Sequence, residues 1–205
     1  MTLFSLKGVK FKDIISYPNI EIEQGKTTFI CGKSGCGKST MLKLLNGVEA
    51  FDSGSLQYCG KEITEYDSIE LRREVLLCGQ SVYLFDGDIR ENFKQFYAYR
   101  DLPSPDDNVI KDYLAVCSAN FKLSTNCATM SGGERQRVFI SICLSFAPKV
   151  LLLDEPTSAL DENTSTELFE NILRYCSKRD ITVIAISHNT SLVRQFADAT
   201  INLED

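Results

Sequence analysis

One stretch of the sequence has the residue types and spacing that phosphate binding requires. It consists of Gly32, Lys33, Ser34, Gly35, Cys36, Gly37, Lys38, Ser39 and Thr40. The three glycines allow backbone N–H groups to turn inward around phosphate oxygens. Lys38 can reach the β- and γ-phosphates of a nucleoside triphosphate, and the Ser39 hydroxyl can ligate Mg²⁺. An apolar run precedes the loop and a helical pattern follows it, which favours a P-loop over an ordinary glycine-rich turn.

A second candidate is a pair of carboxylates, Asp154 and Glu155, at the end of the apolar run 150–153. Ligands gather at the carboxyl ends of strands in parallel sheets. We therefore expect Asp154 to hold Mg²⁺ and Glu155 to act as the general base on a water that attacks the γ-phosphate. The alternative is an acidic turn after a core strand, and the P-loop in the same chain disfavours it.

Two further polar residues follow predicted strands. His188, the only histidine, comes after the apolar run 183–187, and Gln80 comes after the run 75–78. A lone histidine is usually structural, but its place at a strand end beside the presumed site favours a catalytic role. The Gln80 amide could contact Mg²⁺ or the attacking water.

A second predicted anion site begins at Ser131, Gly132 and Gly133, which open a predicted helix. Ser131 can cap that helix, and the glycines allow an anion to approach the N–H groups closely. One chain rarely needs two such sites for one nucleotide. A dimer in which this loop closes over the partner's nucleotide would account for the second site.

The elements that must position these residues alternate along the chain. Residues 1–24 alternate between apolar and polar, which predicts short antiparallel strands. Buried strands and helices then follow one another, which predicts an α/β fold with a mostly parallel sheet. The predicted strands are 28–31, 75–78, 150–153, 181–186 and 199–203, and the predicted helices are 41–45, 133–145, 164–176 and 191–196. Residues 85–131, interrupted by Pro103 and Pro105, are expected to form a small, mainly helical insertion.

The composition of the chain argues against several classes of protein. The formal net charge is −6 and no basic run is present, so nucleic-acid binding is disfavoured. No apolar run approaches the roughly 20 residues of a membrane span, and no secretory signal is expected. The eight cysteines contain no Cys-x-x-Cys pair, which favours free thiols in a reducing cytosol.

Taken together, these residues resemble the ATP-binding cassette (ABC) ATPases. Residues 32–40 resemble Walker A, Gln80 the Q-loop, and the stretch from Met130 to Glu134 the signature loop. Residues 150–155 resemble Walker B, 158–161 the D-loop, and His188 the H-loop. A Walker A alone is widely shared, whereas the Ser-Gly-Gly-x-x-Gln pattern between Walker A and Walker B is specific to this family.

The resemblance implies one nucleotide-binding domain over residues 1–205. That domain would combine a P-loop NTPase core, an N-terminal antiparallel β subdomain and a helical subdomain over about 86–135. It also implies ATP held in a homodimer between one protomer's P-loop and the partner's signature loop. The implied roles are catalysis by Lys38, Gln80, Glu155 and His188, Mg²⁺ binding by Ser39, Gln80 and Asp154, and nucleotide contacts by residues 32–40 and by Ser131, Gly132, Gly133 and Glu134.

The segment 84–92 is similar to the region after the Q-loop in exporter-type ATPases, where it meets the membrane domain. A weaker resemblance links the chain to small stand-alone cassettes of iron or metal exporters. These likenesses imply an ATPase at the cytoplasmic face of the membrane that powers export through a separate transmembrane permease. The alternative is a non-transport ABC ATPase acting on nucleic acid or ribosomes, but such proteins usually carry two cassettes or a long coiled coil.

The sequence departs from the family pattern at a few positions. Met130 and Glu134 replace the usual Leu and Gln of the signature loop, and Asn189 replaces an acidic residue after His188. We expect activity to survive these changes. The residue that stacks on adenine stays open: Phe11 and Tyr17 are the candidates, in a segment that is shorter than usual.

Overall fold

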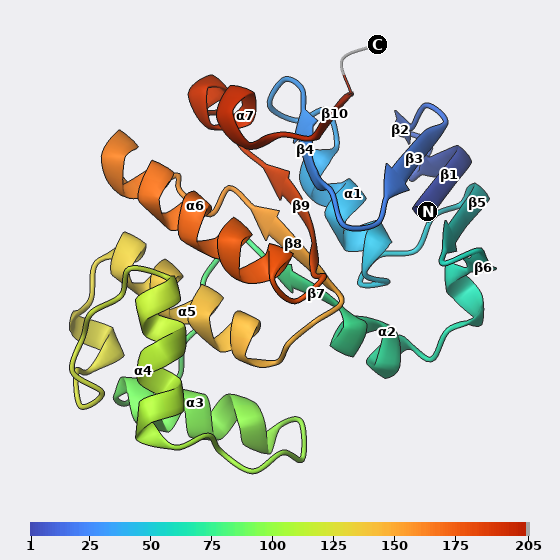
Figure 1. Ribbon diagram of the computed structural model, residues 1–205. Helices are drawn as coiled ribbons and strands as arrows, with labels where there is room; N and C mark the ends of the chain where they lie inside the picture. Colours follow the sequence, from blue (N-terminus) through green and yellow to red (C-terminus); the bar gives the residue numbers. More distant parts are fainter. Residues whose placement is uncertain (204–205) are drawn as a thin grey trace.

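The computed structural model describes residues 1–203, which form two five-stranded sheets with helices packed around them (Figure 1). The elements are, in order, β1 (Thr2–Phe11), β2 (Ile15–Ser16), β3 (Ile20–Glu23), β4 (Thr27–Cys31), α1 (Lys38–Leu45), β5 (Ser53–Tyr58), β6 (Lys61–Glu62), α2 (Ser68–Glu74), β7 (Val75–Cys78), α3 (Ile89–Ala98), α4 (Asp107–Val116), α5 (Gly132–Ser145), β8 (Val150–Asp154), α6 (Glu162–Ser177), β9 (Thr182–Ile186), α7 (Thr190–Phe196) and β10 (Ala199–Asn202). Short 3₁₀ turns lie at Ile63–Glu65 and Cys127–Thr129.

The central sheet has the strand order β10-β4-β9-β8-β7, and its neighbouring strands all run parallel. Every residue of β8 and β9 is buried. Continuous apolar runs are expected of strands that are covered on both faces. The predicted α/β fold with a parallel sheet is confirmed.

The N-terminal strands form a separate antiparallel sheet around β1, which pairs with β2, β3 and β5. The short β6 extends this sheet from β5. Burial alternates along β3, as it should in a strand with one face on a core and the other in solvent. This confirms the antiparallel region predicted for the first 24 residues.

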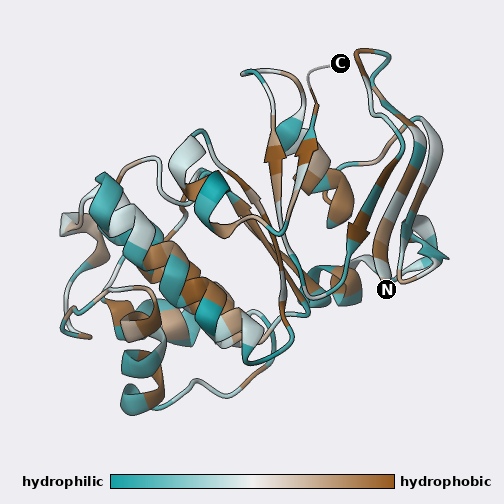
Figure 2. Cartoon of the chain, turned by 45° about the horizontal axis from the view of Figure 1, so that its top comes forward, coloured by the Kyte–Doolittle hydropathy of each residue, from teal (hydrophilic) through white to brown (hydrophobic). Residues whose placement is uncertain are grey.

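The parallel sheet separates two hydrophobic cores. Leu151 and Leu153 of β8 belong to the core that includes α5 and α6, whereas Val150 and Leu152 belong to the core that includes α1 and the antiparallel sheet. Successive side chains of a strand point to opposite faces, so one apolar run serves both cores. Figure 2 shows the strands of the central sheet as mostly brown and the helices with teal and brown faces. The two cores therefore pack on opposite faces of the sheet and hold the carboxyl ends of its strands in place.

The helices α3 and α4 lie at one end of the molecule, beside α5 (Figure 1). Helix α3 begins with a capping box in which the Asp88 and Glu91 side chains bond each other's backbone N–H groups. Arg90 then joins α3 to α4 through two hydrogen bonds to Asp107, of 2.8 and 2.7 Å. Within residues 1–203, no helix is long and apolar enough to cross a membrane.

Candidate nucleotide-binding and catalytic site

The glycine-rich loop connects β4 to α1 and has the backbone that its sequence predicts. Gly35 and Gly37 have positive φ angles of 83° and 100°, a region open to glycine at little cost. A Cβ at Gly37 would lie 3.0 Å from both Ile15 and Tyr17, so that position also has no space for a side chain. The Lys38 ammonium donates hydrogen bonds to the carbonyls of Gly32 and Lys33, at 2.8 and 2.7 Å.

The N-terminus of α1 differs from those of the other α-helices in residues 1–203. Each of the others is capped by an Asp, Ser or Asn side chain, whereas α1 has no side-chain cap and no acidic residue in its first turn. Its first N–H groups are left without a capping oxygen, and the helix dipole favours negative charge there. This end of α1 fits a phosphate group.

Ser39 and Asp154 form the part of the site that suits a metal ion. The Ser39 hydroxyl donates a hydrogen bond of 3.1 Å to Asp154 Oδ1. Burial raises the pKa of Asp154 above its ordinary value, against the lowering effect of the Ser39 hydrogen bond. Both groups offer hard oxygen ligands, and Mg²⁺ in nucleotide sites commonly takes few protein ligands besides phosphate and water. The residues therefore fit Mg²⁺, and a cation there would favour the ionised form of Asp154.

Glu155 lies between two polar residues from neighbouring strands. Gln80 Nε2 donates a 3.3 Å hydrogen bond to Glu155 Oε2, and His188 Nε2 lies 3.1 Å from Glu155 Oε1. The three residues follow β7, β8 and β9, which are adjacent in the sheet, so their carboxyl ends bring these side chains together. The backbone of Glu155 is left-handed, with φ of 51°.

A cavity of about 310 Å³ joins the loop to these side chains. Its lining combines the predicted phosphate loop, the three side chains at the strand ends and one apolar residue. The lining residues are Ile15, Ser34, Gly35, Gly37, Lys38, Ser39, Thr40, Gln80, Glu155 and His188. The arrangement can hold a triphosphate next to a carboxylate.

Residues 131–134 are not part of that lining. They start α5 in a capping box: Glu134 N–H donates to Ser131 Oγ at 3.3 Å, and Glu134 Oε2 accepts from Ser131 N and Oγ, each at 2.8 Å. These bonds hold the pKa of Glu134 below its usual value. Gly133 packs so closely on the segment after β8 that a Cβ would lie 2.6 Å from Leu160 Cδ2.

A family model described as ABC transporter matches residues 15–158. The chain belongs to the ABC transporter family. The protein named "Probable iron export ATP-binding protein FetA" of Escherichia coli (strain K12) is 34% identical over 192 residues, covering 93% of this chain and 84% of that protein. "Methionine import ATP-binding protein MetN" of Clostridium tetani (strain Massachusetts / E88) is 33% identical over 188 residues, covering 88% of this chain and 58% of that protein. A solved bacterial Atm1-family ABC exporter with ATP bound superposes with a TM-score of 0.88 at 25% identity, covering 99% of this chain and 37% of that chain.

This ABC protein is thus an ATP-binding ATPase whose activity is coupled to transport. Its relatives are ATP-binding components of transporters, and they include a protein named for import as well as one named for export. Family membership alone leaves the direction of transport and the substrate open.

The sequence did not predict three contacts that the structure of this ABC ATPase shows. Tyr17 is buried, and its hydroxyl donates a 2.9 Å hydrogen bond to the Gly37 carbonyl. It therefore holds the backbone of the P-loop in place. Phe11 is also buried, and Ile15 is the hydrophobic residue that reaches the cavity. The third contact is a hydrogen bond of 3.2 Å from Gln136 Nε2 to the Glu155 carbonyl. The specific Ser-Gly-Gly-x-x-Gln pattern includes Gln136, but its spacing does not say what the side chain touches.

Proposed function

We propose that this ATPase uses Glu155 as its general base and powers export through a separate membrane subunit. One observation carries the catalytic assignment: Gln80 and His188 approach the two oxygens of Glu155 beside the cavity that the P-loop lines. A carboxylate held on both sides in this way is suited to orient and deprotonate a water molecule.

The hydrolysis step follows from these positions. Lys38, at the base of the cavity, binds the β- and γ-phosphates. Ser39, Asp154 and Gln80 are the residues that would hold Mg²⁺, which supplies neutralisation of the phosphate charge when it is bound. The water oxygen bonds to the γ-phosphorus while Glu155 accepts the water proton. The bond from that phosphorus to the β–γ bridging oxygen breaks, and ADP and phosphate leave.

We infer that the complete site forms in an ATP-dependent homodimer. Residues 131–133 carry the second predicted anion site, yet they do not line the cavity over the P-loop of their own chain. A partner's α5 facing that cavity would add the backbone N–H groups of Gly132 and Gly133 to the γ-phosphate, and the Ser131 hydroxyl would join them by turning from Glu134 to the phosphate. In this arrangement Glu134 acts mainly by capping α5, since its carboxylate already accepts from Ser131.

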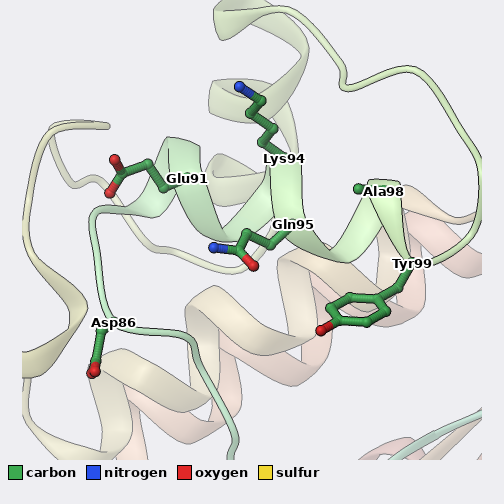
Figure 3. A pocket seen from close by; sticks show the side chains of 6 residues that line it. All are labelled: Asp86, Glu91, Lys94, Gln95, Ala98 and Tyr99. Atoms are coloured by element: carbon green, nitrogen blue, oxygen red, sulfur yellow. The ribbon is translucent and has the colours of Figure 1, made fainter.

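We propose that the membrane subunit binds at a groove along α3, in the helical subdomain predicted over residues 86–135. The groove has a volume of about 550 Å³. Figure 3 shows Asp86 and Glu91 at one end, Tyr99 at the other and Gln95 between them. Phe85 contacts the rings of both Tyr83 and Tyr99, which are 62% and 76% exposed. Exposed aromatic rings beside carboxylates fit a short amphipathic helix that carries basic residues.

We further propose that the transported substrate is iron or another metal and that the transporter exports it. This proposal is supported by the exporter-like segment 84–92, which borders the groove, and by the relative named for iron export. The ATPase would then lie at the cytoplasmic face of the membrane and contact only its permease. The MetN relative makes import the competing direction.

The test is transport by the reconstituted pair. The ATPase and the membrane protein that co-purifies with it are placed in liposomes with the nucleotide-binding side outward. ATP added outside should move Fe²⁺ from the outside buffer into the lumen, which corresponds to export from a cell. Movement of metal out of preloaded vesicles would assign import, and a stable complex that moves no tested metal would remove the metal assignment.

A further inference from the structure

We propose that Gln136 is a positioning residue that fixes the backbone of Glu155 in its active conformation. Gln136 lies on α5, is 5% exposed, and its Nε2 donates a 3.2 Å hydrogen bond to the Glu155 carbonyl oxygen. The proposal rests on the assignment of Glu155 as general base. It adds a residue that does not line the cavity.

Glu155 needs such support because its backbone is unfavourable for a residue with a side chain. Its φ of 51° places it in the left-handed region, which non-glycine residues adopt only when surrounding contacts hold them there. Its N–H donates to the Ile186 carbonyl of β9 at 3.1 Å, and its carbonyl accepts from Gln136 Nε2 and from the Ser158 N–H, each at 3.2 Å. With both backbone groups bonded, the side chain is aimed at Gln80 and His188.

Helix α5 is attached to the same segment at a second point. Gly133, in the first turn, packs against Leu160 and Ala159, and a Cβ there would lie 2.6 Å from Leu160 Cδ2 and 3.1 Å from the Ala159 carbonyl oxygen. The Gln136 bond and the Gly133 contact therefore tie the start of α5 to both ends of the segment 155–160. Loss of the Gln136 bond detaches the Glu155 carbonyl from α5 and leaves it only the local 3.2 Å hydrogen bond from the Ser158 N–H, while the Gly133 packing remains.

The test is a double-mutant cycle of Gln136→Ala and Glu155→Gln, read by kcat and KM for ATP hydrolysis. Gln136→Ala should lower kcat about tenfold, the effect of losing one buried hydrogen bond, with KM for ATP changed less than about twofold. In the Glu155→Gln background it should lower the residual rate no further, because a positioning residue acts only through the group it positions. An equal fold reduction in both backgrounds would overturn the proposal.

The same cycle separates this proposal from the assignment on which it rests. If Glu155→Gln alone hydrolyses ATP at the wild-type rate, the general-base assignment fails and the positioning role fails with it. If Glu155→Gln is slow and Gln136→Ala has wild-type kcat, only the positioning role is wrong. Gln195→Ala, an exposed change on α7, is the matched control and should alter neither constant.

Gln136→Met guards against a folding defect in the alanine variant. Methionine is close to glutamine in length but has no N–H to donate to a carbonyl. It should therefore reproduce the loss of kcat while ATP affinity, measured by titration with a fluorescent analogue, stays within about twofold of wild type. Wild-type kcat in Gln136→Met would overturn the proposal whatever the alanine variant does.

Discussion

The Ser39 hydroxyl and the Asp154 carboxylate, 115 residues apart in sequence, meet at 3.1 Å beneath the P-loop. Burial raises the pKa of Asp154, so the folded protein disfavours its charged form when no cation is bound. A raised acid pKa contributes stability that is present below the unfolded pKa and is lost as pH rises through the folded pKa.

The first prediction concerns Asp154→Asn, which keeps an acceptor for Ser39 but cannot ionise. In EDTA, the free energy of unfolding of the variant relative to wild type should increase as pH rises from below the ordinary aspartate pKa to neutral pH. Urea unfolding at several pH values measures this. A difference that shrinks as pH rises would contradict the buried-charge account. With Mg²⁺ present, the variant should lose ATPase activity by about a hundredfold or more, because a metal ligand is gone.

The second prediction is that Glu155→Gln binds ATP with unchanged affinity but releases phosphate at least about a hundredfold more slowly. With ATP and Mg²⁺ it should also elute from size-exclusion chromatography as a dimer, because the nucleotide stays intact. Glu65→Gln, a change to an exposed residue remote from the cavity, serves as the control. Phosphate release at the wild-type rate would show that another group accepts the proton.

The third prediction tests Tyr17 as a support of the P-loop. Tyr17→Phe removes the hydroxyl that donates to Gly37, so stability should fall by about 1 kcal/mol and ATP should bind roughly twofold to fivefold more weakly. Tyr66→Phe removes a hydroxyl that donates to the Tyr58 carbonyl, away from the cavity. That control should lower stability by a similar amount without changing ATP affinity. Equal affinity losses in the two variants would argue against a specific role for Tyr17.

The fourth prediction concerns the groove along α3. Asp86→Lys combined with Tyr99→Ala should abolish co-purification with the membrane subunit while basal ATPase activity stays at the wild-type level. Arg90 is unsuitable for such a test, because it holds α3 to α4 through Asp107. Ile69→Glu, at an exposed site on α2, is the control. Retention of the partner by the double variant would place the interface elsewhere.

Much of the fold is encoded in local patterns that the sequence displays directly. The run ending at Asp154 is apolar throughout because β8 is covered on both faces, and Asp67, the residue before α2, caps that helix with its side chain. Helix α3 was not separately predicted, although its buried residues Ile89, Phe93 and Tyr97 recur at helical spacing. Apolar residues at helical spacing extend over residues 106–119, but α4 ends earlier, at Val116, because Ser118 takes a left-handed backbone.

The site was harder to predict where it depends on how distant elements face each other. Gln80, Glu155 and His188 could be grouped because each follows a strand, and neighbouring parallel strands end at one edge. Tyr17 gives no such indication: an aromatic residue near a P-loop can stack on a base or pack inward, and only the position of β2 decides. The bond from Gln136 to Glu155 likewise depends on the angle at which α5 meets β8. The catalytic and binding roles themselves stay predictions until the variants are measured.

Ser131 caps the N-terminus of α5, and Gln136 lies on the same helix five residues further along the chain. In the proposed dimer, Ser131 faces the nucleotide of the partner, whereas Gln136 holds the general base of its own chain. A nucleotide bound in one site would thereby improve the alignment of the carboxylate in the other. The two sites should consequently be cooperative, with ATPase activity rising with ATP at a Hill coefficient above one, and Gln136→Ala should bring that coefficient back toward one.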